Sequence, residues 1–600
     1  MKTGALILAG GQSRRMEGVR KEEIPWGNTT FLGLLCCRLW EFQEKLISVG
    51  KGSTALVPGW KTVEDEKADP GPLGGIVSAF HASGADALLV VSCDMPFLPQ
   101  DLPETLIRLL MEEGCDVCIS QDDQGRDYPL CAAYSRSALP TLERAVKSGH
   151  FRVMDALTGL SLHRVPAGSP LLNLNTPEQV RAFRDQYFRL DLDTALERIL
   201  GAVPGTAGAE ILPLNQCAGR FLAQDFSAPM DNPPFDRSAL DGYAVRSQDI
   251  RSASPDAPVR LRVVGSALAG HPSPAAVEEG CALRIMTGAV MPAGSDCVIR
   301  QEDTDCGEET VSIFQAVGAG KNYARRGEDI AEGSLLLSAG QKITPADMGI
   351  LASMGVTDIP VSARPRVALL STGDELALPG QPLKPGCIYN SSLCLLAARL
   401  RELGAEPTVI ELLRDDPAAA ALRIRDIALQ GAADLILTTG GVSVGQKDIF
   451  HQVVPMSGGE LIFWRLKIKP GSPVMFWKLG ETPILSLSGN PFAAYATFEL
   501  LARPALGKLL GTASLSLRPA QAVLASPFEK SGGLRRFLRG TYAGGQVFLP
   551  ENHFSGSLQS LKGCNCLVDI PAGSPPLSPG DRVTILAEDW LLPPQKEGGR

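Results

Sequence analysis

Glycines and cations that follow an apolar run near the N-terminus have the composition of a phosphate-binding loop. In ALILAGGQSRRMEGVRKE, residues 5–22, the apolar run ends at Gly10 and Gly11, and several arginines and Lys21 follow. A glycine turn after a strand lets backbone amides approach phosphate oxygens, and Arg and Lys add charge-assisted hydrogen bonds. The segment therefore predicts a loop for an anionic ligand; the alternative is an ordinary tight turn with a solvated basic face.

Two acidic positions lie near further turns of the same region. Asp94 follows the apolar run in VVSCDMPFLP, and Asp65 precedes the glycine-rich turn in DEKADPGPLGGI. One or two carboxylates together with substrate phosphates are the usual ligands of Mg²⁺, so Asp94 is a candidate metal ligand. The alternatives are a helix-capping aspartate and a flexible loop. The cationic loop, Asp94 and the second turn together point to nucleotidyl transfer.

A second set of motifs lies between residues 365 and 512. STGDEL and TTGGVSVGQKD each carry an apolar strand into a turn with glycines and hydroxyls, and SGNP forms a third turn. Such turns can cradle a phosphate or a pterin, and Glu375 and Asp448 could hold Mg²⁺. The predicted binding residues are Ser371, Thr372, Gly373, Gly440, Gly441, Ser443, Gly489 and Asn490.

Three cations follow in FWRLKIKPGSPVMF: Arg465, Lys467 and Lys469. If Lys467 and Lys469 lie on one strand, they face the same side and could converge on an oxyanion. The alternative is a lysine-rich edge strand that prevents aggregation. Earlier in the chain, DGYAV contains Asp241 and RIMTGA contains Thr287, in polar turns that could equally be Asx turns or a solvated face.

Composition limits the class of protein. The chain has 600 residues, 44% of them hydrophobic and 20% charged, and a net charge of −9. The length favours roughly four domains, and the negative charge excludes a general nucleic-acid binder. We find no signal-like segment and no apolar run long enough for a membrane span, so we expect a cytoplasmic protein without membrane partners. The 14 cysteines are scattered, which indicates reduced thiols.

The pattern of elements predicts a multidomain α/β protein. GALILAGG and ALLVVSCDMP are expected parallel strands of a Rossmann-like N-terminal domain, and residues 176–188 an expected helix. Ligands of such sheets lie at the carboxyl ends of the strands. We predict domains at residues 1–187 (nucleotidyltransferase), 188–364 (a helix and β-rich modules), 365–512 (a second α/β domain) and 513–600 (a small β domain).

The N-terminal motifs resemble those of the molybdenum cofactor guanylyltransferases over about residues 3–187. They are LAGGxSxRM, Lys21, PGPLGG, CDMPFLP and NLNTPEQV, in this order. The resemblance implies that a pterin phosphate attacks the α-phosphate of GTP and that pyrophosphate leaves. It also implies the following roles: Leu8, Ala9, Gly10 and Gly11 contact the nucleotide, Lys21 and Asp65 bind GTP, and Asp94 binds Mg²⁺.

Two positions depart from that family. Glu17 replaces a glycine, and Arg20 replaces an aspartate that could orient Lys21. A carboxylate in a phosphate-facing loop repels the substrate. A degenerate nucleotide-binding module, or a site for another nucleotide, therefore stays open as an alternative.

The motifs DGYAV, RIMTGA, RRGED, STGDE, GGVSVGxxD, KIKPG and SGNP resemble the molybdopterin molybdenumtransferases over about residues 188–595. The resemblance implies insertion of molybdate into adenylated molybdopterin with loss of AMP, by a homodimer. The functional positions it implies are Asp241, Thr287, Glu375, Asp415 or Asp416, Asp448 and Lys469. Arg465 stands where the family commonly has lysine, and it keeps the charge.

The leading hypothesis is one polypeptide that performs two steps of molybdenum cofactor biosynthesis. Its expected ligands are molybdopterin, molybdate, GTP and Mg²⁺, and transient contact with other proteins of the same biosynthesis is expected. A non-catalytic scaffold is an alternative, although the chain lacks the long Pro/Ser-rich linker of scaffolding relatives. Tungstate is too similar to molybdate for the sequence to separate them.

Overall fold

The computed structural model describes residues 2–9, 20–27, 29–50, 57–65, 71–99, 101–168, 171–445, 447–588 and 591–592. The chain forms two compact units, which are described separately. The first comprises Met1–Ala207 and Arg364–Arg600, and the second comprises Gly208–Ala363. No helix within these residues is long and apolar enough to cross a membrane.

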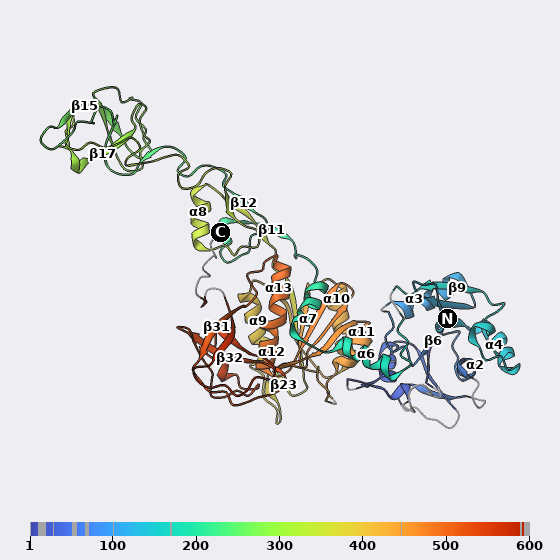
Figure 1. Cartoon of the computed structure of the whole chain (residues 1–600). Coiled ribbons are helices and arrows are strands. Elements are labelled where there is room, and N and C mark those ends of the chain that lie inside the picture. Colours follow the sequence, from blue (N-terminus) through green and yellow to red (C-terminus); the bar gives the residue numbers. More distant parts are fainter. Residues whose placement is uncertain are drawn as a thin grey trace. The chain divides into compact units, whose positions relative to one another are not determined.

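The N-terminal domain is built on a seven-stranded sheet with the order β5-β4-β1-β6-β8-β7-β9 (Figure 1, blue to cyan). Its strands are β1 (Thr3–Leu8), β4 (Glu44–Val49), β5 (Lys61–Glu64), β6 (Ala87–Ser92), β7 (Val117–Gln121), β8 (Asp127–Ser135) and β9 (Leu162–Pro166). Its helices are α1 (Phe31–Arg38), α2 (Gly71–Ala82), α3 (Leu102–Glu113), α4 (Leu139–Lys147), α5 (Val153–Ala156) and α6 (Pro177–Tyr187). The pairing is parallel from β5 to β6, as predicted, and β8 runs antiparallel to both its neighbours.

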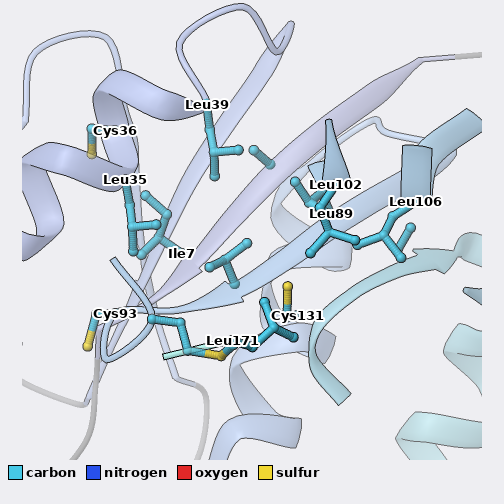
Figure 2. Close-up of a cluster of buried hydrophobic side chains, with 14 of the residues drawn as sticks. Ile7, Leu35, Cys36, Leu39, Leu89, Cys93, Leu102, Leu106, Cys131 and Leu171 are labelled. Atoms are coloured by element: carbon cyan, nitrogen blue, oxygen red, sulfur yellow. The ribbon is translucent and has the colours of Figure 1, made fainter. Parts of the chain in front are cut away.

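Successive residues of β1 face opposite sides of the sheet. Ile7 packs into a cluster with α1 and α3, and Leu6 packs into a second cluster with α2 and α4. Figure 2 shows the first cluster, in which Ile7 and Leu89 meet Leu35 of α1 and Leu106 of α3. Burial on both faces explains why β1 is a continuous apolar run rather than an alternating one.

The predicted helix at residues 176–188 is confirmed as α6. Thr176 caps it, accepts a hydrogen bond from the backbone N–H of Gln179, and forms a capping box with that residue. Pro177 occupies the first turn, where its missing N–H costs nothing.

The second α/β domain has a seven-stranded sheet with the order β10-β27-β29-β30-β26-β22-β25. Its strands are β10 (Phe188–Leu190), β22 (Arg366–Thr372), β25 (Glu406–Leu413), β26 (Leu435–Thr439), β27 (Glu460–Leu466), β29 (Met475–Leu479) and β30 (Thr482–Leu487). Its helices are α7 (Leu192–Ala202), α9 (Ser392–Glu402), α10 (Pro417–Leu429), α11 (Phe450–Ser457), α12 (Pro491–Thr497) and α13 (Arg503–Leu510), with a π-helical turn at Phe498–Ala502. Strands β25, β22, β26 and β30 are mutually parallel, so their carboxyl ends share one edge.

The C-terminal domain is a small β-barrel. Its strands are β31 (Arg518–Leu524), β32 (Arg535–Ala543), β33 (Gln546–Phe548), β34 (Cys566–Ile570) and β35 (Arg582–Ala587). They pair in the order β32-β33-β31-β35-β34, and pairing of β32 with β34 closes the ring. The short strand β28 (Ile468–Lys469) joins β32 from outside. The premise that Lys467 and Lys469 share one strand is wrong, because β27 ends at Leu466 and Lys467 lies in the bend before β28.

The second unit is β-rich, as predicted. It contains a five-stranded sheet of β14 (Gly242–Val245), β15 (Val259–Ala267), β16 (Cys281–Ile285), β17 (Cys297–Arg300) and β18 (Thr310–Ile313). Two-stranded pairs are formed by β11 (Ala209–Pro213) with β21 (Asp358–Ser362), β12 (Phe226–Ser227) with β20 (Leu335–Leu337), and β13 (Arg237–Ser238) with β19 (Tyr323–Ala324). Among the described residues of this unit, α8 (Pro345–Ser353) is the only α-helix.

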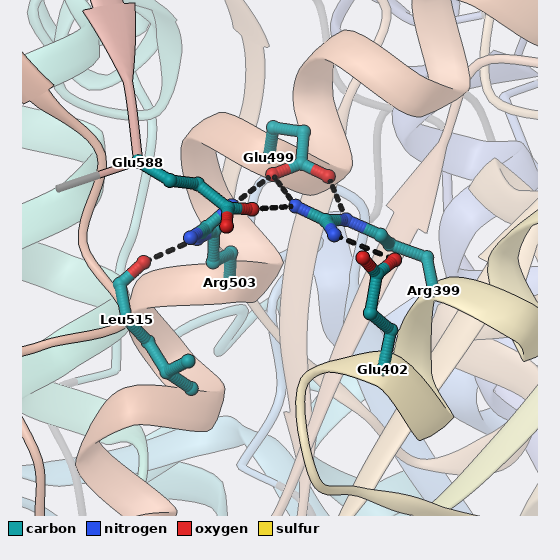
Figure 3. Close-up of polar contacts among 6 residues, drawn as sticks. All are labelled: Arg399, Glu402, Glu499, Arg503, Leu515 and Glu588. Atoms are coloured by element: carbon teal, nitrogen blue, oxygen red, sulfur yellow. Dashed lines mark hydrogen bonds and ion pairs between the residues drawn. The ribbon is translucent and has the colours of Figure 1, made fainter. Parts of the chain in front are cut away.

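A buried ion-pair network joins the barrel to the second α/β domain (Figure 3). Glu499 accepts from Arg399 Nε at 2.6 Å and from Arg503 Nη1 at 2.8 Å. Glu588, which follows the last barrel strand, accepts from the same two arginines at 2.7 and 3.0 Å. Glu499 and Arg503 are each 3% exposed, so removing either charge leaves the other buried and only partly compensated.

We expect Glu499→Gln to lower the free energy of unfolding by about 3 kcal/mol, because the substitution leaves the buried Arg503 and the partly buried Arg399 short of a counter-charge. Glu402→Gln is the matched control: Glu402 also pairs with Arg399, at 2.7 Å, but its side chain is 65% exposed. The control should cost less than about 1 kcal/mol. Urea denaturation of the full chain measures both, and equal effects would contradict the assignment of the network as a buried junction.

Candidate functional site

The carboxyl ends of β1, β4, β5 and β6 lie at one level of the N-terminal sheet. The register pairs Leu8 with Ser48 and with Ser92, and Ser48 with Val63. Each strand therefore ends beside its neighbour, and the residues that follow share one edge. Leu8 and Ala9 are buried there, with the Ala9 N–H donating to the Ser48 carbonyl at 2.9 Å. Gly10, Gly11 and Glu17 lie outside the described residues.

Lys21 is held at this edge by two side chains. Its Nζ donates to Asp94 Oδ2 at 3.0 Å and to Asn175 Oδ1 at 2.5 Å. Asn175 in turn donates to Asn173 Oδ1 at 2.5 Å. Two predicted site residues, Lys21 and Asp94, thus meet, although 73 positions separate them. Asn175 was not predicted as a site residue; the signal that could have found it is its place in the NLNTPEQV motif, directly before the Thr176 helix cap.

Asp94 has the surroundings of a metal ligand. It is 9% exposed, and its Oδ1 has no hydrogen-bond partner among the residues the structure describes. A buried carboxylate oxygen is costly without a partner, and a hard cation is one group that would complete it. Its donor chemistry therefore fits the predicted Mg²⁺.

Asp65 follows β5 and is also buried. Its Oδ1 accepts from the Ser48 hydroxyl at 3.0 Å, and burial raises the pKa of its carboxyl. Gly75 of α2 permits the close approach of the helix here, because a Cβ at this position would lie 2.5 Å from Ser48 Oγ. Asp65 and Asp94 therefore follow β5 and β6 at the same edge of the sheet, with β4 and β1 between them.

Arg20 forms a separate, exposed ion pair. It lies 3.8 Å from Glu23, and its side chain is 49% exposed. The aspartate that Arg20 replaces in the resembling family is not needed to hold Lys21 here, because Asp94 and Asn175 do so.

In the second α/β domain, the predicted turns meet at the shared edge of β22, β26 and β30. Ser371 Oγ accepts from Asn390 Nδ2 at 2.8 Å and from Thr439 Oγ1 at 2.9 Å, and all three residues are buried. The buried Thr372 Oγ1 has no hydrogen-bond partner within the described part of the chain. This hydroxyl layer fixes the ends of two strands beneath the predicted pterin loops.

Glycine is required where these loops touch. Gly440 has a φ of +89°, and a Cβ there would lie 2.6 Å from the Thr372 carbonyl oxygen. A Cβ on Gly489 would lie 3.4 Å from the Gly440 Cα. Gly373 and Gly441 also have positive φ, while Ser443 accepts at its carbonyl from His451 Nε2 at 3.0 Å. Asn490 is the N-cap of α12.

The acidic residues in and near these loops have different hydrogen-bond partners. Asp374 and Asp415 exchange hydrogen bonds between backbone N–H and side chain at 3.2 and 3.3 Å, and Asp374 pairs with Lys447 at 3.2 Å. Burial, followed by the nearby Asp374 and Glu375 charges, raises the pKa of Asp415. Asp416 instead caps α10 through Ala418 and Ala419 N–H.

The predicted metal pair is only partly defined. Asp448 Oδ2 accepts from the Gly445 N–H at 2.6 Å. Across the described chain, no three His, Cys, Asp or Glu side chains are grouped so that they could hold a metal ion. Glu375 and Asp448 stay predicted ligands, of the kind that needs substrate oxygens to complete a Mg²⁺ shell.

The three predicted cations, Arg465, Lys467 and Lys469, lie where the chain passes from β27 of the second α/β domain to β28, which pairs with the barrel. The backbone of Arg465 has a φ of +72°, which is strained for a residue other than glycine. Its guanidinium lies 5.2 Å from the centre of the Trp464 ring. Burial, with the nearby Arg189 charge, lowers the pKa of Arg465. Lys467 and Lys469 are exposed on either side of the buried Ile468.

The second unit brings together the two residues predicted there. Asp241 Oδ1 accepts from both the backbone N–H and the hydroxyl of Thr287, each at 2.7 Å. These bonds lower the pKa of the Asp241 carboxyl. The adjoining Gly242 has no room for a side chain, since a Cβ would lie 1.8 Å from the Ile299 carbonyl oxygen.

Comparison with known families accounts for most of the chain. Residues 5–163 match the MobA-like NTP transferase domain, and residues 190–355 match the MoeA N-terminal region (domain I and II). Residues 368–508 match a family described as "Probable molybdopterin binding domain", and residues 521–587 match the MoeA C-terminal region (domain IV).

Individual relatives are consistent with these family matches. The molybdopterin molybdenumtransferase of Haemophilus influenzae is 35% identical over 410 residues, which are 67% of this chain and 100% of that protein. Molybdopterin molybdenumtransferase 2 of Mycobacterium tuberculosis is 37% identical over 381 residues, 62% of this chain and 94% of that protein. The crystal structure of the molybdopterin biosynthesis MoeA protein of Pyrococcus horikoshii aligns with a TM-score of 0.59 at 29% identity, covering 66% of this chain and all of that one.

An α/β nucleotidyltransferase fold followed by molybdopterin-binding and β modules defines a transferase of molybdenum cofactor biosynthesis. The chain belongs to the molybdopterin molybdenumtransferase family and carries, at its N-terminal end, a MobA-like NTP transferase domain.

The buried His451 generates a pH dependence of stability. Burial lowers its pKa from 6.5 to about 4, so the folded chain holds it neutral while the unfolded chain protonates it first. Between these two values the unfolded state binds more protons, so stability falls as the pH falls from 6.5 toward 4, by about 3 kcal/mol in all. His451→Gln keeps a donor for the Ser443 carbonyl and should flatten this slope. Unfolding midpoints measured from pH 7 to pH 4 test it, and parallel slopes for the two proteins would contradict it.

Proposed function

We propose that the chain catalyses two steps of molybdenum cofactor biosynthesis. The molybdenumtransferase part inserts molybdate into adenylated molybdopterin with release of AMP. The N-terminal domain then transfers GMP from GTP to the molybdenum-loaded cofactor. Membership of the family supports the first step, and the contacts of Lys21 support the second.

The observation that carries the nucleotidyl step is the arrangement of Lys21, Asp94 and Asn175. The ammonium group is positioned by two side chains at the sheet edge, and the second oxygen of Asp94 has no hydrogen-bond partner among the described residues. A positioned cation next to a free carboxylate oxygen is suited to a triphosphate with a divalent cation. The contacts of Lys21 with Asp94 and Asn175 therefore support nucleotidyl transfer despite the arginine at position 20.

In the proposed reaction, a phosphate oxygen of the pterin attacks the α-phosphorus of GTP. The bond from that phosphorus to the oxygen bridging the β-phosphate breaks, and pyrophosphate leaves with the electron pair. Lys21 stabilises the negative charge on the transferring group. Mg²⁺ held by Asp94 would neutralise charge on the phosphate oxygens.

We expect Asp94→Asn to lower GMP transfer by about 100-fold, since it removes the charge that would hold the cation. Molybdate-dependent release of AMP should be unchanged, because the second site lies in another domain. Asp123→Asn, at an exposed turn of the same N-terminal domain, is the matched control. Chromatographic detection of the guanylated cofactor measures transfer, and full transfer by Asp94→Asn would refute the role.

In the molybdenumtransferase part, the cations Arg465, Lys467 and Lys469 would attract the molybdate oxyanion. Glu375 and Asp448 would hold a Mg²⁺ that neutralises charge at the adenylate phosphate. The turns at 371–376, 440–445 and 488–491 would cradle the pterin and its phosphate. Asp241 and Thr287 are further proposed functional positions, in a homodimer with transient contacts to other proteins of the same biosynthesis.

Lys469→Ala should reduce molybdate insertion, measured as the rate of molybdate-dependent AMP release, by about 100-fold, because a cation proposed to face the oxyanion is lost. Lys562→Ala, an exposed lysine in the β-barrel, is the control. GMP transfer to cofactor supplied already loaded with molybdenum should be normal in both. Unchanged AMP release by Lys469→Ala would remove this lysine from the site.

A further inference from the structure

A cavity of about 690 Å³ is lined by residues of the N-terminal domain and of the second α/β domain, which belong to the same compact unit. Its volume lies in the range of small-molecule sites. The segment Pro96–Pro99, which begins two residues after Asp94, forms one wall. His451, which donates to the Ser443 carbonyl of the glycine-rich loop, lines another. The cavity thus adjoins segments that belong to both proposed sites.

Direct contacts hold the two walls together. Trp40 Nε1 donates to the Met456 carbonyl of α11 at 3.0 Å, and Glu41 pairs with Arg425 at 2.8 Å. Trp40 and Cys37 also pack against the hydrophobic cluster beneath α10 and α11. Because both polar and apolar contacts join the domains, the cavity is preformed.

One side of the cavity is aromatic. The ring of Phe97 lies 4.7 Å from Trp26 and 4.7 Å from Phe183, and Phe183 lies 4.5 Å from Tyr187. Trp26 and Phe183 are buried, whereas Phe97 and Tyr187 are half-buried and keep surface toward the cavity. A flat heterocycle can stack on such a surface.

The charged groups of the lining are mostly acidic. Asp101 and Glu460 are exposed carboxylates, and the Asp101 side chain does not cap its helix α3. The guanidinium of Arg38 is engaged by both Glu104 oxygens at 3.0 Å. Burial keeps His451 neutral at pH 7, since its pKa is about 4. Phosphate groups are therefore disfavoured here, while a ring that presents N–H donors is favoured.

We propose that this cavity binds the 2-amino-4-oxopyrimidine ring that pterins and guanine share. Its amino group and ring N–H would donate to Asp101 or Glu460, and its face would stack on Phe97 and Tyr187. The phosphate end of the same molecule would stay outside the cavity, because the charged groups of the lining are mostly acidic. The proposal rests on the proposed function, because it gives the pterin a binding site lined by both domains. Binding itself requires neither reaction.

Equilibrium titration of the full chain with pterin, guanosine and adenosine tests the proposal. Comparing pterin with guanosine shows whether the cavity prefers the ring as part of a pterin or as part of guanine. Adenosine is the negative control, because its ring lacks the adjacent amino and ring N–H donors. Thr105→Trp fills the cavity from α3 and should remove a pterin-binding component that the wild type shows. Pterin binding elsewhere in the chain would survive this substitution, so the difference isolates the cavity.

Asp101→Asn and Glu460→Gln are the milder variants, and they keep the proposal testable if Thr105→Trp does not fold. At least one should weaken pterin binding by about tenfold, the effect of losing a charged hydrogen bond. Glu113→Gln, at the far end of α3, should have no effect. Adenosine binding as tightly as pterin, or pterin curves of all variants superimposing on the wild type, would overturn the proposal. GTP binding and GMP transfer are measured separately, so their failure is distinguishable from failure here.

Discussion

The edge where parallel strands end is the constraint on which both predicted sites depend. Strands β1 and β22 are buried on both faces, so their central residues are apolar, and polar groups stand at or just beyond their carboxyl ends. The register then brings these ends to one level: Leu8 beside Ser48 and Ser92 in one sheet, and Ser371 beside Thr439 in the other. Lys21, Asp94 and the glycine-rich loops are neighbours because the strands before them are.

Packing around these edges leaves little freedom. Gly75 admits α2 against Ser48, and Gly440 admits its loop against Thr372, where a Cβ would collide with neighbouring atoms. The buried hydroxyl layer of Ser371, Thr439 and Asn390 satisfies polar groups that would otherwise cost free energy beneath the loops. The proposed ligand contacts would thus fall to backbone amides and to a few side chains that the packing already positions.

Local patterns predicted the elements, and motif order indicated candidate ligand-binding residues, whose roles stay predictions. The apolar runs gave β1, β6, β22 and β26, and Thr176 with Pro177 marked the start of α6, because these signals act over a few residues. The path of Lys467 and Lys469 was not predictable in this way, since the chain leaves one sheet at Leu466 and joins the barrel two residues later. Likewise, Asn175 meets Lys21 across 154 positions, and Arg399 meets Glu588 across 189. Contacts of that separation follow from the fold, which no local pattern encodes.

The central claim is that one chain loads molybdenum and then attaches the nucleotide. A single time course tests it most directly: purified chain with adenylated molybdopterin, molybdate, Mg²⁺ and GTP, with AMP and pyrophosphate measured together. The account predicts that AMP appears first, that pyrophosphate follows with a lag, and that omitting molybdate suppresses both. AMP release without any GTP-dependent pyrophosphate or guanylated product would contradict it, and would leave the N-terminal domain as a nucleotide-binding module alone.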